Sequence, residues 1–419
     1  MKTIIEDLFK LDRQLLGSGY NSSLIYINQL IPLSVLEFQS GTKIGTWEIP
    51  EEWVVHEAWL KHNGKIILDY KKEPLSLVVG SLPFEGKVDR KTLLTHMHYS
   101  DVQPDAFPYE YKFYEKDWGF TIPKDRVYKV VDGKNEFILP DDEYEVCIKT
   151  EYKPSVMKIG VHTIQGKTDK EILLFAHLDH PWQANDNLSG VAALIDLVKH
   201  IKPYQYEHTI KLVFCPETIG STAYALSQDT SRVDFVIALD CVGNVNKDGI
   251  LLHRSFDTTS RVNNCAHLAM RQSAEGFRHA PFRSSIGSDE YAFNDPKIGI
   301  PGLMLSTHPY PEYHTSKDTP DIIDYKTIEK VQRIIINTIR YYEEDFIPVP
   351  NFKGPLHRSK FGIQHTGKGI NMAWDYLIYS MDGIKPLSEL CNEFGLNFEY
   401  TKELLDKLGE EISRSTPTR

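Results

Sequence analysis

The sequence is poor in cysteine, and its cysteines show no paired spacing. Cys147, Cys215, Cys241, Cys265 and Cys391 are odd in number and widely scattered. This distribution speaks against a disulfide framework and against a zinc site built from paired thiolates. We therefore expect a protein of a reducing compartment, the cytoplasm.

Long apolar runs and an excess of positive charge are also missing. No stretch approaches the roughly 18 uninterrupted apolar residues of a membrane helix, and residues 1–16 lack the apolar region of a secretory signal. Lysine and arginine number 47 against 58 aspartates and glutamates, which gives a formal net charge of -11. We expect neither a membrane nor a nucleic acid as a partner.

The chain of 419 residues is longer than one hydrophobic core usually fills, so several compact units are expected. Residues 1–40 predict helices that pack on the central domain. Residues 41–150 contain short β-type runs broken by proline and glycine, which predict a β-rich lobe. Residues 151–347 predict an α/β domain, and residues 351–419 predict a small helical domain.

Within the lobe, the expected strands are residues 46–49, 65–68, 75–79 and 144–148. Aromatic residues crowd into 99–120, where they fit the lining of a substrate cleft and the core of a small β lobe about equally well.

From residue 170 onward, strand and helix patterns alternate. Runs 171–176, 210–215 and 233–239 predict buried strands, and apolar spacing between Leu188 and Val198 predicts a helix. This alternation favours a largely parallel sheet flanked by helices.

The last part of the chain is separated by a long predicted helix, 325–345, and by Ile347-Pro348-Val349-Pro350, which we interpret as a linker. Beyond it, two apolar helix faces on either side of Gly395 predict a helix-turn-helix. Its second helix is acidic, which favours a packing or homo-oligomer surface over DNA binding. The acidic residues are Glu399, Glu403, Asp406, Glu410 and Glu411.

Five segments carry candidate chemistry, and each lies where a predicted strand ends or a loop precedes a helix. In an open α/β sheet such ends share one crevice, where ligands bind. The segments are His177-Leu178-Asp179-His180, Asn185-Asp186-Asn187-Leu188-Ser189-Gly190, Pro216-Glu217-Thr218-Ile219-Gly220, Leu239-Asp240-Cys241-Val242-Gly243 and Tyr313-His314-Thr315-Ser316-Lys317-Asp318-Thr319.

These residue types are those of a zinc centre, which needs imidazoles, carboxylates and one unligated carboxylate to move a proton. Asp186 is the natural bridging ligand, with His177 and Asp240 on one ion and His314 on the other. Glu217 is the candidate general base and later acid.

Two further groups are candidates for supporting this chemistry. Asp179 lies two residues from His177 on the same strand face, where it would orient a ligating imidazole. Tyr313 or Tyr310 would donate a hydrogen bond to a tetrahedral oxyanion.

The order of these motifs resembles the zinc aminopeptidases of the bacterial leucyl aminopeptidase kind. The resemblance covers residues 171–345 and includes Ser288-Asp289-Glu290-Tyr291-Ala292-Phe293 and Gly299-Ile300-Pro301. Several motifs in the right order are far more specific than any one alone. The resemblance implies a zinc-exopeptidase-like α/β fold, a mixed sheet flanked by helices, with one or two Zn²⁺ ions.

The whole chain is similar to a bacterial aminopeptidase-like subgroup described as associated with polysaccharide biosynthesis. The similarity is carried by Trp118-Gly119-Phe120, His180-Pro181, 184–190, 216–220 and 313–316. It implies an inserted β-rich lobe and a C-terminal winged helix at 351–419.

Two departures from the wider family leave details open. Thr218 stands where the family has a second glutamate that ligates one ion, and Glu290 is a candidate replacement carboxylate. His180, which precedes a proline as in the subgroup, competes with His177 as the imidazole ligand.

The leading function is a zinc hydrolase that cleaves an amide bond next to a free amino group, with a small peptide or amide-containing small molecule as substrate. One alternative is an amide hydrolase acting on an acylated or aminoacylated sugar precursor. A second is a binding scaffold without turnover, which is suggested by Thr218 in place of a ligating glutamate. A third is a transcriptional regulator.

Overall fold

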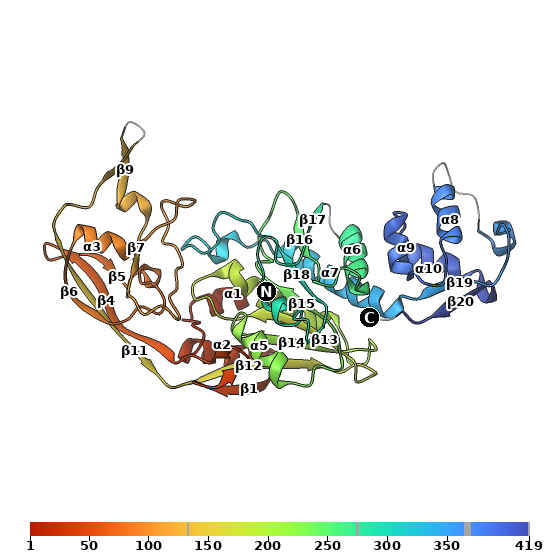
Figure 1. Ribbon diagram of the computed structural model, residues 1–419, viewed down its shortest axis with the longest axis horizontal. Helices are drawn as coiled ribbons and strands as arrows, with labels where there is room; N and C mark the ends of the chain where they lie inside the picture. The colour runs from red at the N-terminus through yellow and green to blue at the C-terminus, as the bar shows by residue number, and fades with distance from the viewer. Residues whose placement is uncertain (132–133, 274–275, 364–369, 418–419) are drawn as a thin grey trace.

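The computed structural model describes residues 1–131, 134–273, 276–363 and 370–417. Figure 1 shows an elongated molecule with a β lobe at one end, a central sheet with helices, and a smaller helical part at the other end.

The central part is built on an eight-stranded mixed sheet in the order β1-β12-β14-β13-β15-β18-β16-β17. Its middle strands β14, β13, β15 and β18 run parallel, whereas β12 and β16 pair antiparallel with β14 and β18. The strands are β1 Ser34–Gln39, β12 Val156–Ile164, β13 Glu171–His177, β14 Thr209–Cys215, β15 Val233–Leu239, β16 Ile250–His253, β17 Phe277–Ala280 and β18 Gly302–Ser306. The predicted α/β class and its mixed sheet are confirmed.

Helices cover both faces of this sheet because its buried strands carry apolar side chains on both sides. Ile172 and Leu174 of β13 pack with the larger core cluster, whereas Leu173 and Phe175 between them pack with the cluster on the opposite face. The larger cluster contains α1 Lys2–Phe9, α2 Ser18–Leu30, α4 Ser189–Leu197, α6 Arg261–Ser273 and α7 Tyr325–Glu344, and the other contains α5 Ile219–Ser227.

The lobe is built on a four-stranded antiparallel sheet in the order β5-β4-β11-β6. These strands are β4 Glu52–His62, β5 Lys65–Asp69, β6 Phe84–Asp89 and β11 Glu143–Lys153. Smaller elements are β2 Lys43–Ile44, β3 Trp47–Glu48, α3 Arg90–Thr95, β7 Met97–His98, β8 Phe120–Thr121, β9 Tyr128–Val131 and β10 Lys134–Phe137.

The strand predicted at 75–79 is wrong. The short 3-10 helix η1, Pro74–Ser76, begins there, with the Glu73 side chain accepting from Leu75 N–H at its N-terminus. Leu75, Leu77 and Val79 are nevertheless buried in the lobe core. The apolar residues at every second position thus reflect burial in the core and not a strand. Pro74, the first residue of η1, favours the helical turn.

The C-terminal part contains α8 Ile370–Tyr379, α9 Leu387–Glu393 and α10 Phe398–Asp406, and α9 packs on α6. The predicted linker is instead a strand, β19 Ile347–Pro350, paired antiparallel with β20 Ile412–Ser415. A strand at the edge of a two-stranded sheet tolerates its two prolines. The winged-helix assignment for 351–419 stays a prediction.

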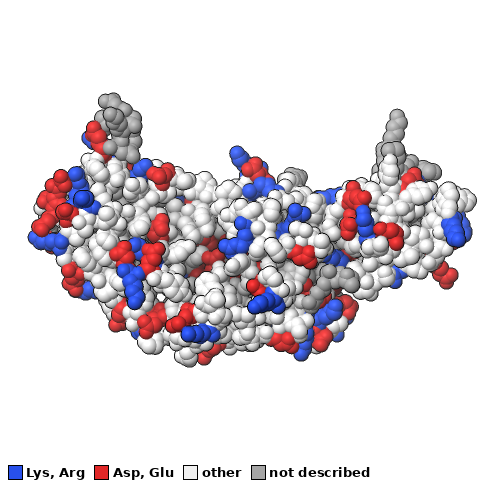
Figure 2. All heavy atoms as spheres, in the orientation of Figure 1, with Lys and Arg blue, Asp and Glu red and all other residues white. Residues whose placement is uncertain are grey.

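Two further observations concern the charge of the surface and the length of the apolar helices. Acidic and basic side chains are interspersed over the face shown in Figure 2. Among the described residues, no helix is long and apolar enough to cross a membrane.

Candidate metal centre

Strand ends bring the predicted residues together. His177 is the last residue of β13, Glu217 follows β14 after one proline, and Asp240 directly follows β15. His314 lies in the loop after β18. Because β13, β14, β15 and β18 are parallel neighbours, their carboxyl ends meet at one edge of the sheet.

The carboxylate of Asp186 is the centre of the cluster. Its Oδ1 lies 2.9 Å from His177 Nε2 and 3.1 Å from His180 Nδ1, and its Oδ2 lies 2.9 Å from His314 Nε2. The structure therefore brings both candidate imidazoles of the first motif to the same carboxylate, so His177 and His180 are not mutually exclusive as ligands.

Several of these close contacts are not hydrogen bonds. His180 Nδ1, His314 Nε2 and Asp186 Oδ2 are all buried, and none has a hydrogen-bond partner. Buried polar atoms normally have a hydrogen-bond partner. Atoms that approach to about 3 Å without hydrogen-bond geometry are therefore arranged as ligands of one metal ion would be. The donor set of imidazole nitrogens and carboxylate oxygens is the one that zinc prefers.

Asp240 and Glu217 complete the arrangement. His177, Glu217 and Asp240 each offer one ligand atom within 4.8 Å of the others, and so do His177, His180 and Asp186. Burial raises the pKa of Asp240 to about 7, although His177 opposes this shift. A buried carboxylate with a raised pKa is stabilised as an anion by a bound cation.

Glu290 is buried close by but does not join these groups. Its Oε2 accepts from Ser288 N–H at 2.9 Å, and its Oε1 has no hydrogen-bond partner. Burial raises the pKa of Glu290 to about 8. Among the described residues, none of the clusters with metal-ligand spacing contains Glu290, so its assignment as a ligand stays a prediction without this geometric support.

Asp179 contacts Glu217, the candidate base, rather than His177. Its carboxylate accepts from Glu217 N–H at 2.9 Å, and it lies 3.9 Å from His180 Nε2. Nδ1 of His177 instead faces Ser288 Oγ at 3.3 Å and Asp289 Oδ2 at 3.8 Å. Asn187, whose side-chain amide also lies 3.3 Å from this Nδ1, contacts the first imidazole together with Ser288 and Asp289. Asp179 instead contacts the backbone that carries Glu217.

Arg13 is a supporting residue that the sequence did not reveal. It lies between α1 and α2, is fully buried, and donates through its two terminal nitrogens to four carbonyls at 2.7–2.9 Å. Its Nε donates to Leu8 at 3.2 Å. The four carbonyls belong to the loop after β13, at Leu178, Asp179, His180 and Gln183. Arg13 thus anchors the N-terminal helices to the loop that carries His180.

A second anchor, Asp318, holds the turn that carries Asp186. The Asp318 carboxylate accepts from the backbone N–H of Asn185 at 2.6 Å and of Asp186 at 3.1 Å. The Tyr310 hydroxyl donates a hydrogen bond to Asp318 at 2.8 Å. This bond engages the hydroxyl that was one of the two candidate oxyanion donors. Tyr313 instead stacks on the His314 ring, with 4.0 Å between the ring centroids.

The lobe closes over the same centre. Tyr109 donates from its backbone N–H to the His314 carbonyl at 2.7 Å, and its buried ring contacts His180 and His314. A cavity of about 380 Å³ opens beside His180 and Glu217 and is walled by Tyr111 and neighbouring aromatics. Part of the aromatic segment 99–120 thus lines this cavity, whereas Phe107, Trp118 and Phe120 lie in the lobe core. A role of the segment in substrate binding stays a prediction.

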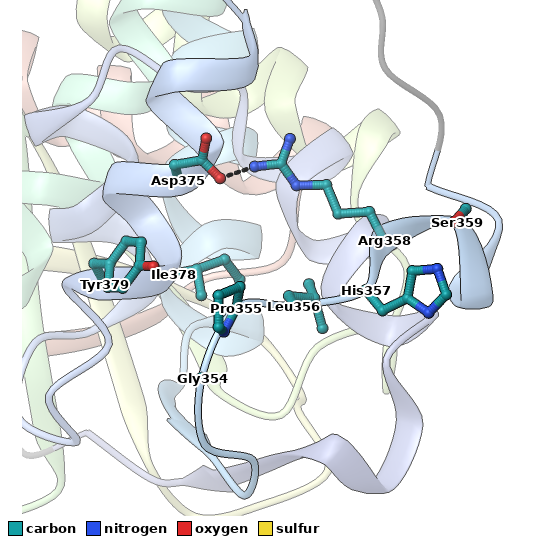
Figure 3. Close-up of a pocket in the computed structure, with 9 residues that line it drawn as sticks. All are labelled: Gly354, Pro355, Leu356, His357, Arg358, Ser359, Asp375, Ile378 and Tyr379. Carbon is teal, nitrogen blue, oxygen red and sulfur yellow. Dashed lines mark hydrogen bonds and ion pairs between the residues drawn. The ribbon is translucent and has the colours of Figure 1, made fainter.

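A separate cavity of about 330 Å³ lies in the C-terminal part, between residues 354–359 and α8. Figure 3 shows Arg358 in it reaching Asp375, its ion-pair partner. Its lining includes none of the candidate zinc ligands.

The mixed sheet, its flanking helices and the imidazole–carboxylate cluster at the strand ends define an aminopeptidase-like α/β protein. The chain belongs to the family described as "Domain of unknown function (DUF4910)", whose model matches residues 2–345. A relative from Clostridium acetobutylicum, described as a candidate polysaccharide biosynthesis protein with an aminopeptidase-like domain, is 27% identical. The match covers 97% of this chain and 93% of the relative.

Solved structures agree with this assignment. A candidate peptidase from Clostridium acetobutylicum is 25% identical with a TM-score of 0.81, covering 99% of this chain and 96% of its own. A zinc aminopeptidase from Bacillus subtilis is 14% identical with a TM-score of 0.59, covering 81% of this chain and 93% of its own. The second likeness shows the fold.

Proposed function

We propose that this protein is a zinc-dependent hydrolase that cleaves an amide bond next to a free amino group. The observation that carries the proposal is the Asp186 carboxylate, which has imidazole nitrogens at 2.9–3.1 Å on both of its oxygens. Two of those nitrogens lack hydrogen-bond partners. The aminopeptidase-like fold supports the same conclusion.

The proposed ligands divide over the two oxygens of Asp186. His177 and Asp240 would hold one ion together with Asp186 Oδ1, and His314 lies on the Oδ2 side. His180, whose Nδ1 is buried, unsatisfied and 3.1 Å from the same Oδ1, would add a ligand on the His177 side. An ion at this place would polarise the scissile carbonyl and lower the pKa of water toward about 7.

Glu217 is the proposed general base. Burial would raise its pKa, but contact with His180 and the charge of His177 outweigh burial and lower it, so the side chain is ionised at neutral pH. It faces the cavity beside His180, where it would take the proton from the attacking water and give it to the departing amine. The Asp179 contact to Glu217 N–H keeps the carboxylate in place.

The proposed substrate is a small peptide or another amide-containing molecule whose scissile bond lies in the pocket beside the base. Tyr313 is the remaining phenol proposed to donate to the oxyanion, because the hydroxyl of Tyr310 is engaged by Asp318. A second candidate is an amide hydrolase that acts on an acylated sugar precursor. It is favoured by the description of the Clostridium acetobutylicum relative as a polysaccharide biosynthesis protein.

The test combines metal content with a substrate panel. Protein purified without chelator should hold about one or two zinc ions per chain, and should hydrolyse aminoacyl-p-nitroanilides or N-acyl sugars. The preferred substrate class decides between the two enzymatic candidates. Less than about one zinc per chain, with no hydrolysis after zinc addition, would favour the binding scaffold instead.

A further inference from the structure

A second cavity lies next to the cavity beside Glu217. This second cavity, of about 540 Å³, is walled by α5, the turn before β3 and the segment 291–298. Trp47 lines both cavities. The two cavities are therefore neighbours that meet at Trp47, and together they are called the groove.

Helix α5 gives the groove its direction. Ile219 lines the catalytic cavity, whereas Thr222 and Leu226 line the second one. These residues are spaced three and seven positions apart, which places them on one helix face. Seven residues of helix correspond to about 10 Å, so the groove extends well beyond a single aminoacyl group.

Aromatic rings are exposed along the far wall. Phe256 is 62% and Tyr291 is 45% exposed, although both are large apolar side chains. The Phe282 ring contacts both of them. It stacks with the Tyr291 ring, with 6.3 Å between the ring centroids, and meets the Phe256 ring edge-on, with 5.8 Å between the centroids. Such a run of exposed rings in a concave surface indicates a ligand site.

The chemistry of the wall favours sugar rings over a peptide backbone. An extended peptide is held mainly by hydrogen bonds to a strand edge. Among the residues that line the second cavity, however, only Trp47 belongs to a strand, and that strand, β3, is two residues long. A pyranose ring offers a C–H face for aromatic stacking and hydroxyls at its rim. Thr46, Thr222 and Asp295 supply oxygen atoms on the same walls.

We propose that this groove binds an oligosaccharide that carries the scissile amide, with one sugar beside Glu217 and the following units over Trp47 and the Phe256–Tyr291 wall. The proposal rests on the proposed function, since it names the substrate class of the same site. It further makes Phe256 and Tyr291 residues that determine specificity for longer substrates.

The test is calorimetric titration of the zinc-loaded Glu217→Gln protein, in which turnover is blocked, with the monomer, dimer and tetramer of β-1,4-linked N-acetylglucosamine. We expect affinity to rise with length. Phe256→Ala and Tyr291→Ala in this background should each weaken tetramer binding about tenfold. Tyr204→Ala, which removes an exposed ring elsewhere, should leave it unchanged.

Affinity that is independent of length, or absence of saccharide binding, would overturn the proposal. Tighter binding of a tetrapeptide than of the tetrasaccharide would overturn the sugar assignment. Zinc content and the hydrolysis of aminoacyl-p-nitroanilides and N-acyl sugars by the wild-type protein are measured separately. A failed titration with zinc and hydrolysis intact therefore refutes only the oligosaccharide groove, whereas loss of both refutes the proposed function.

Discussion

Arg13 offers a sensitive test of how the metal centre is held. Arg13→Met removes a buried cation and leaves the backbone carbonyls of the loop 178–183 without their donors. Methionine fills similar space, so the change removes hydrogen bonds more than volume.

The expected magnitude follows from these bonds. Hydrogen bonds to a charged group contribute about 1.5–3 kcal/mol each and are not additive. Burying the guanidinium also has a cost, which lowers the pKa of Arg13 to about 10. We therefore expect a net loss of about 3–5 kcal/mol, because each buried carbonyl left without a donor costs about 1–3 kcal/mol and these costs do not add in full.

Because the freed loop carries His180, zinc affinity should fall about 10- to 100-fold. The assay is competition with a chromophoric chelator, alongside urea unfolding of the metal-free protein. Arg261→Met is the matched control, since Arg261 stacks on Tyr342 and donates to its carbonyl, away from the centre. It should lower stability without changing zinc affinity. Wild-type zinc affinity in Arg13→Met would refute the proposed anchoring role.

Three further predictions concern the base, the bridging carboxylate and a buried histidine. Glu217→Gln should keep zinc, measured by atomic absorption, while turnover falls about 10²- to 10⁴-fold; retained turnover would remove Glu217 from its role. Asp186→Ala should lose zinc and activity together, and normal zinc content would contradict its central position. His208, held by Asp234 at 3.0 Å and Glu343 at 2.9 Å, has a raised pKa because these carboxylates outweigh burial. Its stabilisation is complete below the unfolded pKa of about 6.5 and is lost as pH rises through the folded value. In urea unfolding, His208→Gln should therefore cost about 1–3 kcal/mol at pH 6 and less at pH 9, and an equal cost at both would contradict this linkage.

The parts of the site that follow from local sequence were predictable. His177, Glu217 and Asp240 each end or follow a buried apolar strand, so parallel pairing alone places them at one edge. Asp186 lies in the short helical segment Ala184–Leu188 that precedes α4, and His314 lies in the loop after β18. Their residue types and their positions beside a predicted helix or strand end indicated them. The structure adds that His177 and His180 both approach the same Asp186 oxygen. The spacing of residues in the sequence does not predict this shared contact.

The supporting groups could not be predicted because they act across long sequence separations. Arg13 contacts carbonyls about 165 residues away, and nothing in its own neighbourhood marks it as buried. Asp318 belongs to the segment 313–319 that the sequence singles out, but its bonds to the backbone of Asn185 and Asp186 depend on how two distant segments fold together. The same reason applies to β19, whose partner β20 lies more than 60 residues later.

The central claim is that the cluster around Asp186 holds a divalent ion. Anomalous diffraction at the zinc edge from crystals grown without chelator tests it most directly. The account predicts a peak at about 2.0–2.2 Å from an Asp186 carboxylate oxygen and from His177 Nε2. A zinc-supplemented crystal with no anomalous peak within ligand distance of Asp186 would contradict it.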